Sequence, residues 1–241
     1  VAFHSLINDI KTSDVSEEYG GMVLVCGSPG EVANDPQLGA LFSVENRLQS
    51  FVSRLNANQQ KSDIFWSIAF KAEDQLGQRS VWNMLQILTV VPPNIDAFKE
   101  TEVYAVYADI LGRHIFGNYL DLLLEVSYSA LQGEHLTYVG GKSHAYIYEK
   151  EGRLSAPDEN WPREVMQLFS IGLFKLNEDG TPELDENGVE QATYGNEDIM
   201  SFARGWTGFL RHPSRGNIES HDGQSRVDPM HINPEYRDRF P

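Results

Sequence analysis

Cysteine, basic side chains and long apolar runs are all scarce in this chain. Its 241 residues include one cysteine, Cys26, so no internal disulfide can form and zinc sites built on several thiolates are excluded. The 19 Lys and Arg are outnumbered by 35 Asp and Glu, which gives a formal net charge of −16. Nucleic-acid binding requires a basic face, so we expect no nucleic-acid partner. No apolar run approaches the roughly 20 residues of a membrane span, so we expect none in this segment.

The two ends of the chain also lack features. It begins at Val1 without a methionine, shows no signal peptide, and stops at Pro241 without a terminal helix. We therefore expect it to be a fragment of a longer protein, in which missing targeting signals carry little weight.

What the sequence does contain is mostly helical periodicity. Apolar residues at i, i+3, i+4 and i+7 predict helices over 41–55 and 103–115, and Asn118 is a predicted N-cap for a helix that carries Leu122, Leu123 and Val126 inward. We expect a mainly α, multi-helix single domain over residues 41–210. An irregular N-terminal segment over 1–40 and an irregular C-terminal strap over 211–241 flank it. We find no internal repeat.

One segment has a β pattern. Residues 173–194 predict strand, turn, strand, turn, strand, and Asn187-Gly188 is a strong hairpin signal because both residues tolerate positive φ. Pro182 places its strand at an edge. We expect this ribbon to protrude from the helical domain.

Two motifs on either side of the ribbon are the most specific feature. The first is Pro157-Asp-Glu-Asn-Trp-Pro-Arg-Glu-Val-Met-Gln-Leu-Phe-Ser-Ile-Gly172, with a helix expected from about Trp161 to Ile171 and Gly172 as its stop. The second is Asn196-Glu-Asp-Ile-Met-Ser-Phe-Ala-Arg-Gly-Trp-Thr-Gly208, with a helix expected from about Asn196 to Thr207. Together they resemble the paired signature of a family known as domain of unknown function 1800 (DUF1800).

The resemblance covers about residues 80–225. An upstream element of the family is similar to two short stretches here, Arg113-His114 and then Gly117-Asn118-Tyr119-Leu120-Asp121-Leu122-Leu123. Downstream, the family has a His-Asp-Gly element at the place of His221-Asp222-Gly223. This chain departs from the usual pattern at Pro162, Gln167 and Gly205. No activity is established for the family, so the resemblance implies a way of building the domain and no reaction. Bacterial members are frequently exported, which implies an exported or extracellular protein.

The polar residues of the signature are Asn160, Arg163, Glu164 and Arg204, with Trp206 inside the second helix. Two arginines beside a carboxylate can clamp an anion. The other interpretation, which we favour, is a buried ion-pair network that fixes how the two helices cross. It predicts that Arg163 or Glu164 contacts Arg204 or its neighbours in the interior, and that Arg204→Ala is strongly destabilising.

The ribbon is a weak candidate for calcium. Asp179, Glu183, Asp185 and Asn187 offer the oxygen ligands that Ca²⁺ prefers. However, the twelfth position of the EF-hand-like loop that begins at Glu183 is Tyr194 rather than Glu, so a solvated hairpin arm is the simpler interpretation.

The sequence favours a non-catalytic structural or protein-interaction module of a larger, exported assembly, with no catalytic residue. The acidic ribbon is then the expected contact with a protein partner or a second copy. The alternative is a hydrolase-like enzyme that uses Glu164 with an anion clamp of Arg163 and Arg204. The two differ in whether Glu164 faces a cleft.

Overall fold

The computed structural model describes residues 65–66, 69–91, 102–215, 218, 220 and 222–239. The expected irregular segment over 1–40 and the expected helix over 41–55 lie outside these residues. The chain forms two compact units, Val1–His135 with Arg211–Met230 and Leu136–Leu210 with His231–Pro241. The segment 41–210, expected as one domain, and the expected strap over 211–241 each contribute residues to both units.

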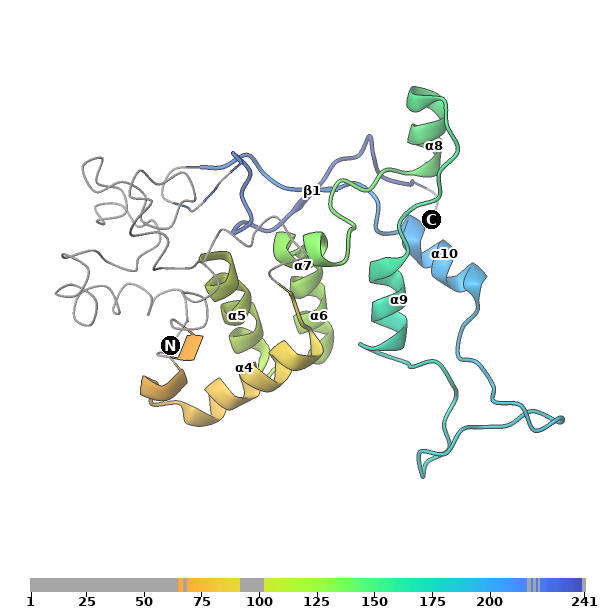
Figure 1. Cartoon of the computed structure of the whole chain (residues 1–241), viewed down its shortest axis with the longest axis horizontal. Coiled ribbons are helices and arrows are strands. Elements are labelled where there is room, and N and C mark those ends of the chain that lie inside the picture. Colours follow the sequence, from red (N-terminus) through yellow and green to blue (C-terminus); the bar gives the residue numbers. More distant parts are fainter. Residues whose placement is uncertain are drawn as a thin grey trace, which may run out of the picture. The chain divides into compact units, whose positions relative to one another are not determined.

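The first unit is a group of packed helices (Figure 1). They are α4 (Gln75–Ile87), α5 (Glu102–His114), α6 (Tyr119–Tyr128) and α7 (Ala130–His135). Helix α5 packs against each of the other three. Its apolar stripe is buried, including Val103, Tyr107 and Leu111, as the periodicity predicted.

Helix α6 begins where the sequence predicts. The side chain of Asn118 accepts a hydrogen bond from the Leu120 N–H, which satisfies a backbone donor that a helix start leaves without a partner. Leu122 and Val126 are buried.

Tyr107 links three parts of this unit. Its hydroxyl lies 2.8 Å from the carbonyl oxygen of Leu88, after α4, and 2.7 Å from Oε1 of Gln132 on α7. All three residues are buried, and burial raises the pKa of Tyr107, so the hydroxyl keeps its proton. One side chain of α5 therefore connects the C-terminal end of α4 with the middle of α7.

The second unit contains the two signature helices, α9 (Asn160–Gln167) and α10 (Asn196–Arg204), which pack against each other. It also holds α8 (His144–Tyr146), the π-helix η4 (Ile147–Glu151), and the antiparallel strands β1 (Phe209–Leu210) and β2 (His231–Ile232). The mainly α fold class is confirmed. Both signature helices are shorter than expected.

Glycines end both signature motifs for a steric reason. Gly172 has φ 76° and donates its N–H to Met166, which makes it the left-handed stop that the sequence predicts. Gly208 has φ 85°, and a Cβ built there would lie 2.8 Å from the carbonyl oxygen of Asn233. Only glycine fits where β1 begins.

Aromatic side chains form the core of the second unit. Trp161 of α9 is fully buried, and its ring centroid lies 5.2 Å from that of Tyr138 and 5.5 Å from that of Trp206. The Trp206 ring stacks in turn on Phe209 of β1 at 5.3 Å. Trp161 lies on α9, whereas Trp206 follows the end of α10 and does not lie inside that helix as expected; the contact between their rings packs the two signature motifs together.

We expect Tyr107→Phe to destabilise the first unit by about 1–3 kcal/mol, because it leaves the buried Leu88 carbonyl and the Gln132 amide without this partner. Urea denaturation measures the loss. Tyr148→Phe is the matched control, since Tyr148 is exposed and a surface substitution changes stability by about 0.5 kcal/mol or less. Equal effects of the two substitutions would show that the hydrogen bonds of the Tyr107 hydroxyl do not stabilise the first unit.

Candidate functional site

The signature arginines form ion pairs that differ from the predicted network. Nη2 of Arg163 lies 2.8 Å from Oε1 of Glu159, one turn earlier in the chain, and the Arg163 side chain is 37% exposed. Nε of Arg204 lies 2.8 Å from Oδ2 of Asp238, and the Arg204 side chain is 43% exposed. The prediction of an interior charge network is therefore wrong for both arginines. Since exposed ion pairs contribute little, we no longer expect a large loss from Arg204→Ala.

Glu164 and Asn160 have different surroundings. The Asn160 side chain donates to the Thr137 hydroxyl at 2.7 Å. Oε2 of Glu164 is buried and has no hydrogen-bond partner among the described residues. Among the described residues, the structure shows no ion pair for the Glu164 carboxylate, in contrast to Arg163 and Arg204.

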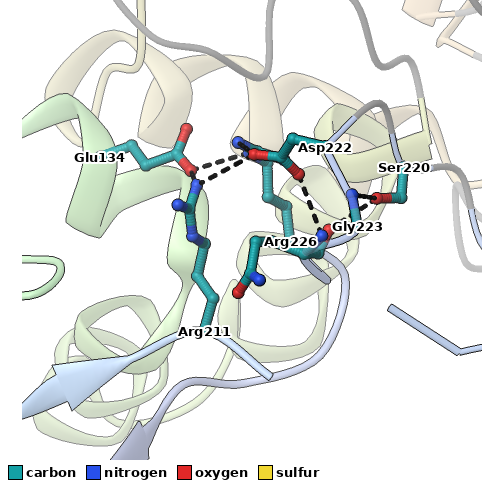
Figure 2. Close-up of polar contacts among 7 residues, drawn as sticks. Glu134, Arg211, Ser220, Asp222, Gly223 and Arg226 are labelled. Carbon is teal, nitrogen blue, oxygen red and sulfur yellow. Dashed lines mark hydrogen bonds and ion pairs between the residues drawn. The ribbon is translucent and has the colours of Figure 1, made fainter. Parts of the chain in front are cut away.

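A charge cluster around one fully buried arginine of the first unit was not predicted (Figure 2). It consists of Glu134, Arg211, Asp222 and Arg226. Arg226 is fully buried, and its Nε donates to Oε1 of Glu134 at 2.7 Å. Its two terminal nitrogens bind the two carboxylate oxygens of Asp222 at 3.0 and 2.8 Å, a bidentate arrangement. Arg211 also binds Glu134.

Each member of this charge cluster is positioned by its local chain. Glu134 lies near the end of α7, and Asp222 and Arg226 are four residues apart in the strap. Gly223, at φ 78°, donates its N–H to the Ser220 hydroxyl and so shapes the turn that presents Asp222 (Figure 2). The sequence signal was weak. Residues 211–241 hold five arginines and five acids, but the pairing of Arg226 with Glu134 spans 92 residues.

Two of the proposed calcium ligands form turns of the ribbon. Oδ1 of Asp179 accepts from the Thr181 N–H and hydroxyl at 3.0 and 2.6 Å. Oδ1 of Asp185 accepts from the Asn187 and Val189 N–H groups at 2.8 and 2.9 Å. Within the part of the chain that the structure describes, no three His, Cys, Asp or Glu side chains lie close enough together to hold a metal. The structure does not bring Asp179, Glu183 and Asp185 together.

The ribbon itself is a three-armed segment, residues 173–193. Lys175, Glu183 and Gln191 form a closed ring of backbone hydrogen bonds: Lys175 donates to Gln191, Gln191 to Glu183, and Glu183 to Lys175, at 2.8–2.9 Å. Three arms leave this ring. Two are turns closed by bonds from Asn177 to Thr181 and from Asp185 to Val189, and the third is the stem, closed by a bond from Thr193 to Leu173. Figure 1 shows the two turns as a fork between α9 and α10.

An eight-residue repeat encodes this geometry, which corrects the expectation of no internal repeat. The two copies are Leu176-Asn-Glu-Asp-Gly-Thr-Pro-Glu183 and Leu184-Asp-Glu-Asn-Gly-Val-Glu-Gln191. Gly180 and Gly188 occupy the same place in each and have φ of 83° and 79°. The repeat was detectable as two acidic turns at a fixed spacing, but the closure of the ring was not.

Comparison with known proteins identifies the chain's family. The sequence model of the family described as protein of unknown function (DUF1800) matches residues 14–239. The chain belongs to this family. No curated protein and no solved structure matches it.

In this DUF1800 chain, two family elements hold ion pairs. The Arg113-His114 pair binds Glu125 of α6 from the end of α5. Burial raises the pKa of Glu125, but hydrogen bonds from Arg113 and His114 outweigh it, so the pKa lies below its ordinary value. In the His-Asp-Gly element, Asp222 binds the buried Arg226; His221 lies outside the described residues.

We expect Arg226→Ala to destabilise the first unit by about 2–4 kcal/mol, because it removes a fully buried side chain and one of the two arginines that neutralise Glu134. Chemical denaturation measures the loss. The matched control is Arg215→Ala in the same strap, where the exposed arginine pairs with Asp228 and the expected loss is about 1 kcal/mol or less. If the two substitutions have the same effect, the charge cluster does not anchor the strap.

The turn at Asp185 should depend on pH. Hydrogen bonds from the Val189 and Asn187 N–H groups lower the pKa of Asp185 from its ordinary value of 3.8. The ionised carboxylate of Asp185 therefore stabilises the folded turn. This stabilisation is fully present at pH values above the ordinary pKa and is lost as the pH falls through the lowered pKa. The NMR shift of the Val189 amide reports it. In Asp185→Asn the side-chain oxygen still accepts but does not titrate, so the Val189 shift should stay constant; a midpoint at or above 3.8 in the unsubstituted chain would contradict the assignment.

Proposed function

We propose that this chain is a non-catalytic structural or protein-interaction module of a larger, exported assembly, and that the three-armed segment is its contact with a protein partner. The observation that carries the proposal is the exposure of apolar side chains on that segment. Leu176, Leu184 and Val189 are each more than half exposed. Apolar side chains gathered at such a site are typical of surfaces that a partner covers.

The charge of the segment supports the same proposal. Residues 173–193 carry six acidic side chains and one lysine, a net charge of −5. The acids of this segment are exposed, apart from the partly buried Glu183. Like charges at this density repel one another unless solvent, cations or a basic surface neutralise them. A basic protein surface would relieve this repulsion on contact.

Its placement also suits a contact surface. The hydrogen bonds of the ring and of the three arms join residues of the segment to one another. The segment therefore holds its shape by internal bonds, although it extends between α9 and α10 (Figure 1). A preformed surface loses less entropy on binding than a flexible loop does.

The export part of the proposal rests on family membership alone, since bacterial members are frequently exported. No described helix is both long and apolar enough to span a bilayer.

The second candidate is a hydrolase-like enzyme based on Glu164. The unpartnered, buried Oε2 of Glu164 favours it, because catalytic carboxylates often sit in such surroundings. The pairing of both arginines speaks against it. An anion clamp would need Arg163 and Arg204 to leave Glu159 and Asp238. We therefore rank the interaction module first.

The proposal predicts the result of shortening the segment. Phe174 and Ala192 form a bridge, so residues 175–191 can be replaced by an Asn-Gly turn that keeps the stem. We expect a nearly unchanged melting temperature, because the removed hydrogen bonds were internal to the segment. We also expect loss of a protein that the intact chain retains, measured first by differential affinity capture and then with that protein purified.

The matched control replaces Glu149, Tyr148 and Lys150, which are exposed and lie outside the segment, with serine. It should retain the same partner. Unfolding of the shortened chain, or an identical set of retained proteins, would contradict the proposed role of the segment.

A further inference from the structure

The three-armed segment has two chemically different faces. Side chains alternate across an extended chain, so residues two apart share a face. The ring residues Lys175, Glu183 and Gln191 lie on one face, where Nζ of Lys175 approaches Oε1 of Gln191 at 3.5 Å. Their neighbours lie on the opposite face: Phe174, Leu176, Pro182, Leu184, Glu190 and Ala192. Five of these six are apolar, so we name this the apolar face.

Within the part of the chain that the structure describes, most of the apolar face is exposed. Leu176 and Leu184, which occupy the same position of the eight-residue repeat, are 58% and 56% exposed, and Phe174 is 39% exposed. A shallow, open hollow of about 640 Å³ lies on this segment. Three residues of the apolar face line it, Pro182, Leu184 and Glu190, together with Asn177, Thr181, Glu183 and Gln191.

The backbone N–H and C=O groups of the ring are already hydrogen-bonded to one another. Lys175, Glu183 and Gln191 each donate their N–H and accept at their C=O within the ring. A partner therefore cannot add a strand through these groups, and recognition must come from side chains.

Acidic side chains surround the apolar face. Glu178 and Asp179 lie on one turn, Asp185 and Glu186 on the other, and Glu190 on the face itself. A second copy would bring a net charge of −5 against another −5, which electrostatic complementarity disfavours. Apolar side chains flanked by lysine or arginine fit both properties of the surface.

We propose that the apolar face binds a protein segment in which apolar residues alternate with lysine or arginine. This inference rests on the proposed function, and it adds the surface and the chemistry of the partner. The leucines bury apolar area on binding, and the acids of the turns supply attraction and orientation.

The test uses the whole chain and three labelled peptides of equal length, in fluorescence anisotropy. One alternates lysine with leucine, one lysine with serine and one glutamate with leucine. We expect the lysine–leucine peptide to bind most tightly, and its affinity to fall at high salt. Equal binding of the lysine–serine peptide would overturn the proposal, because it would reduce the contact to charge alone.

Variants then separate the two contributions. Leu176→Ser with Leu184→Ser should weaken binding of the lysine–leucine peptide roughly tenfold, because two leucines lose apolar burial. Glu178→Gln with Glu186→Gln should weaken it a few-fold, mainly through the association rate. The matched controls are Leu154→Ser and Glu149→Gln, which change exposed residues of the same unit outside the segment and should leave binding unchanged.

Two outcomes distinguish this inference from the proposed function. If the leucine double variant binds peptide and the purified partner normally while the shortened chain loses the partner, the segment is the contact but the apolar face is the wrong surface. If neither change affects any complex, the proposed function itself fails. A melting temperature equal to that of the unsubstituted chain establishes that each variant is folded.

Discussion

The guanidinium of Arg226 is buried completely, and a buried cation is tolerated only where anions surround it. Glu134 of α7 and Asp222 of the strap supply those anions, and Arg211 adds a second cation to Glu134. The path of the strap depends on this requirement. Residues 211–230 belong to the first unit, whereas β1 and β2 on either side pair with each other in the second. The charge cluster therefore holds the middle of a segment whose two ends are held by strand pairing.

In the second unit, burial of aromatic rings has the equivalent role. Trp161 and Trp206 come from different signature motifs and meet over Tyr138 and Phe209. The polar residues of the same motifs lie at the edges, where Arg163 and Arg204 pair with acids of their own chain. The family signature in this chain is thus largely explained by packing of two helices, and Glu164 is the residue that this explanation leaves over.

The three-armed segment obeys a different constraint. Its exposed leucines and valine gain no stabilisation from burial, and its acidic side chains lie close enough together to repel one another. Its shape is maintained by turns with glycine at positive φ and by aspartates that accept backbone hydrogen bonds. A surface that is kept in shape yet left uncovered is what a binding module needs, and this is why the proposed function centres on it.

Local chemistry determined much of this protein in advance. The apolar period of α5, the cap at Asn118 and the left-handed stop at Gly172 all depend on residues a few positions apart, and the sequence was sufficient to predict them. A turn also forms at Asn187-Gly188, but of these two residues only Gly188 has the positive φ that the hairpin signal predicted for both. The signature motifs likewise identified the family. Even so, one local feature, the pairing of Glu159 with Arg163, was overlooked in favour of a longer-range network.

Tertiary structure alone decided the charge pairs between residues far apart in the chain and how the ribbon closes. Asp238 binds Arg204 across 34 residues and Glu134 binds Arg226 across 92, although every arginine has nearer acids in the sequence. The third side of the hydrogen-bonded ring, from Lys175 to Gln191, likewise joins residues that no single turn connects. Backbone preferences act over one turn and depend on neighbouring residues. A long-range ion pair instead forms between residues that packing of the core brings together.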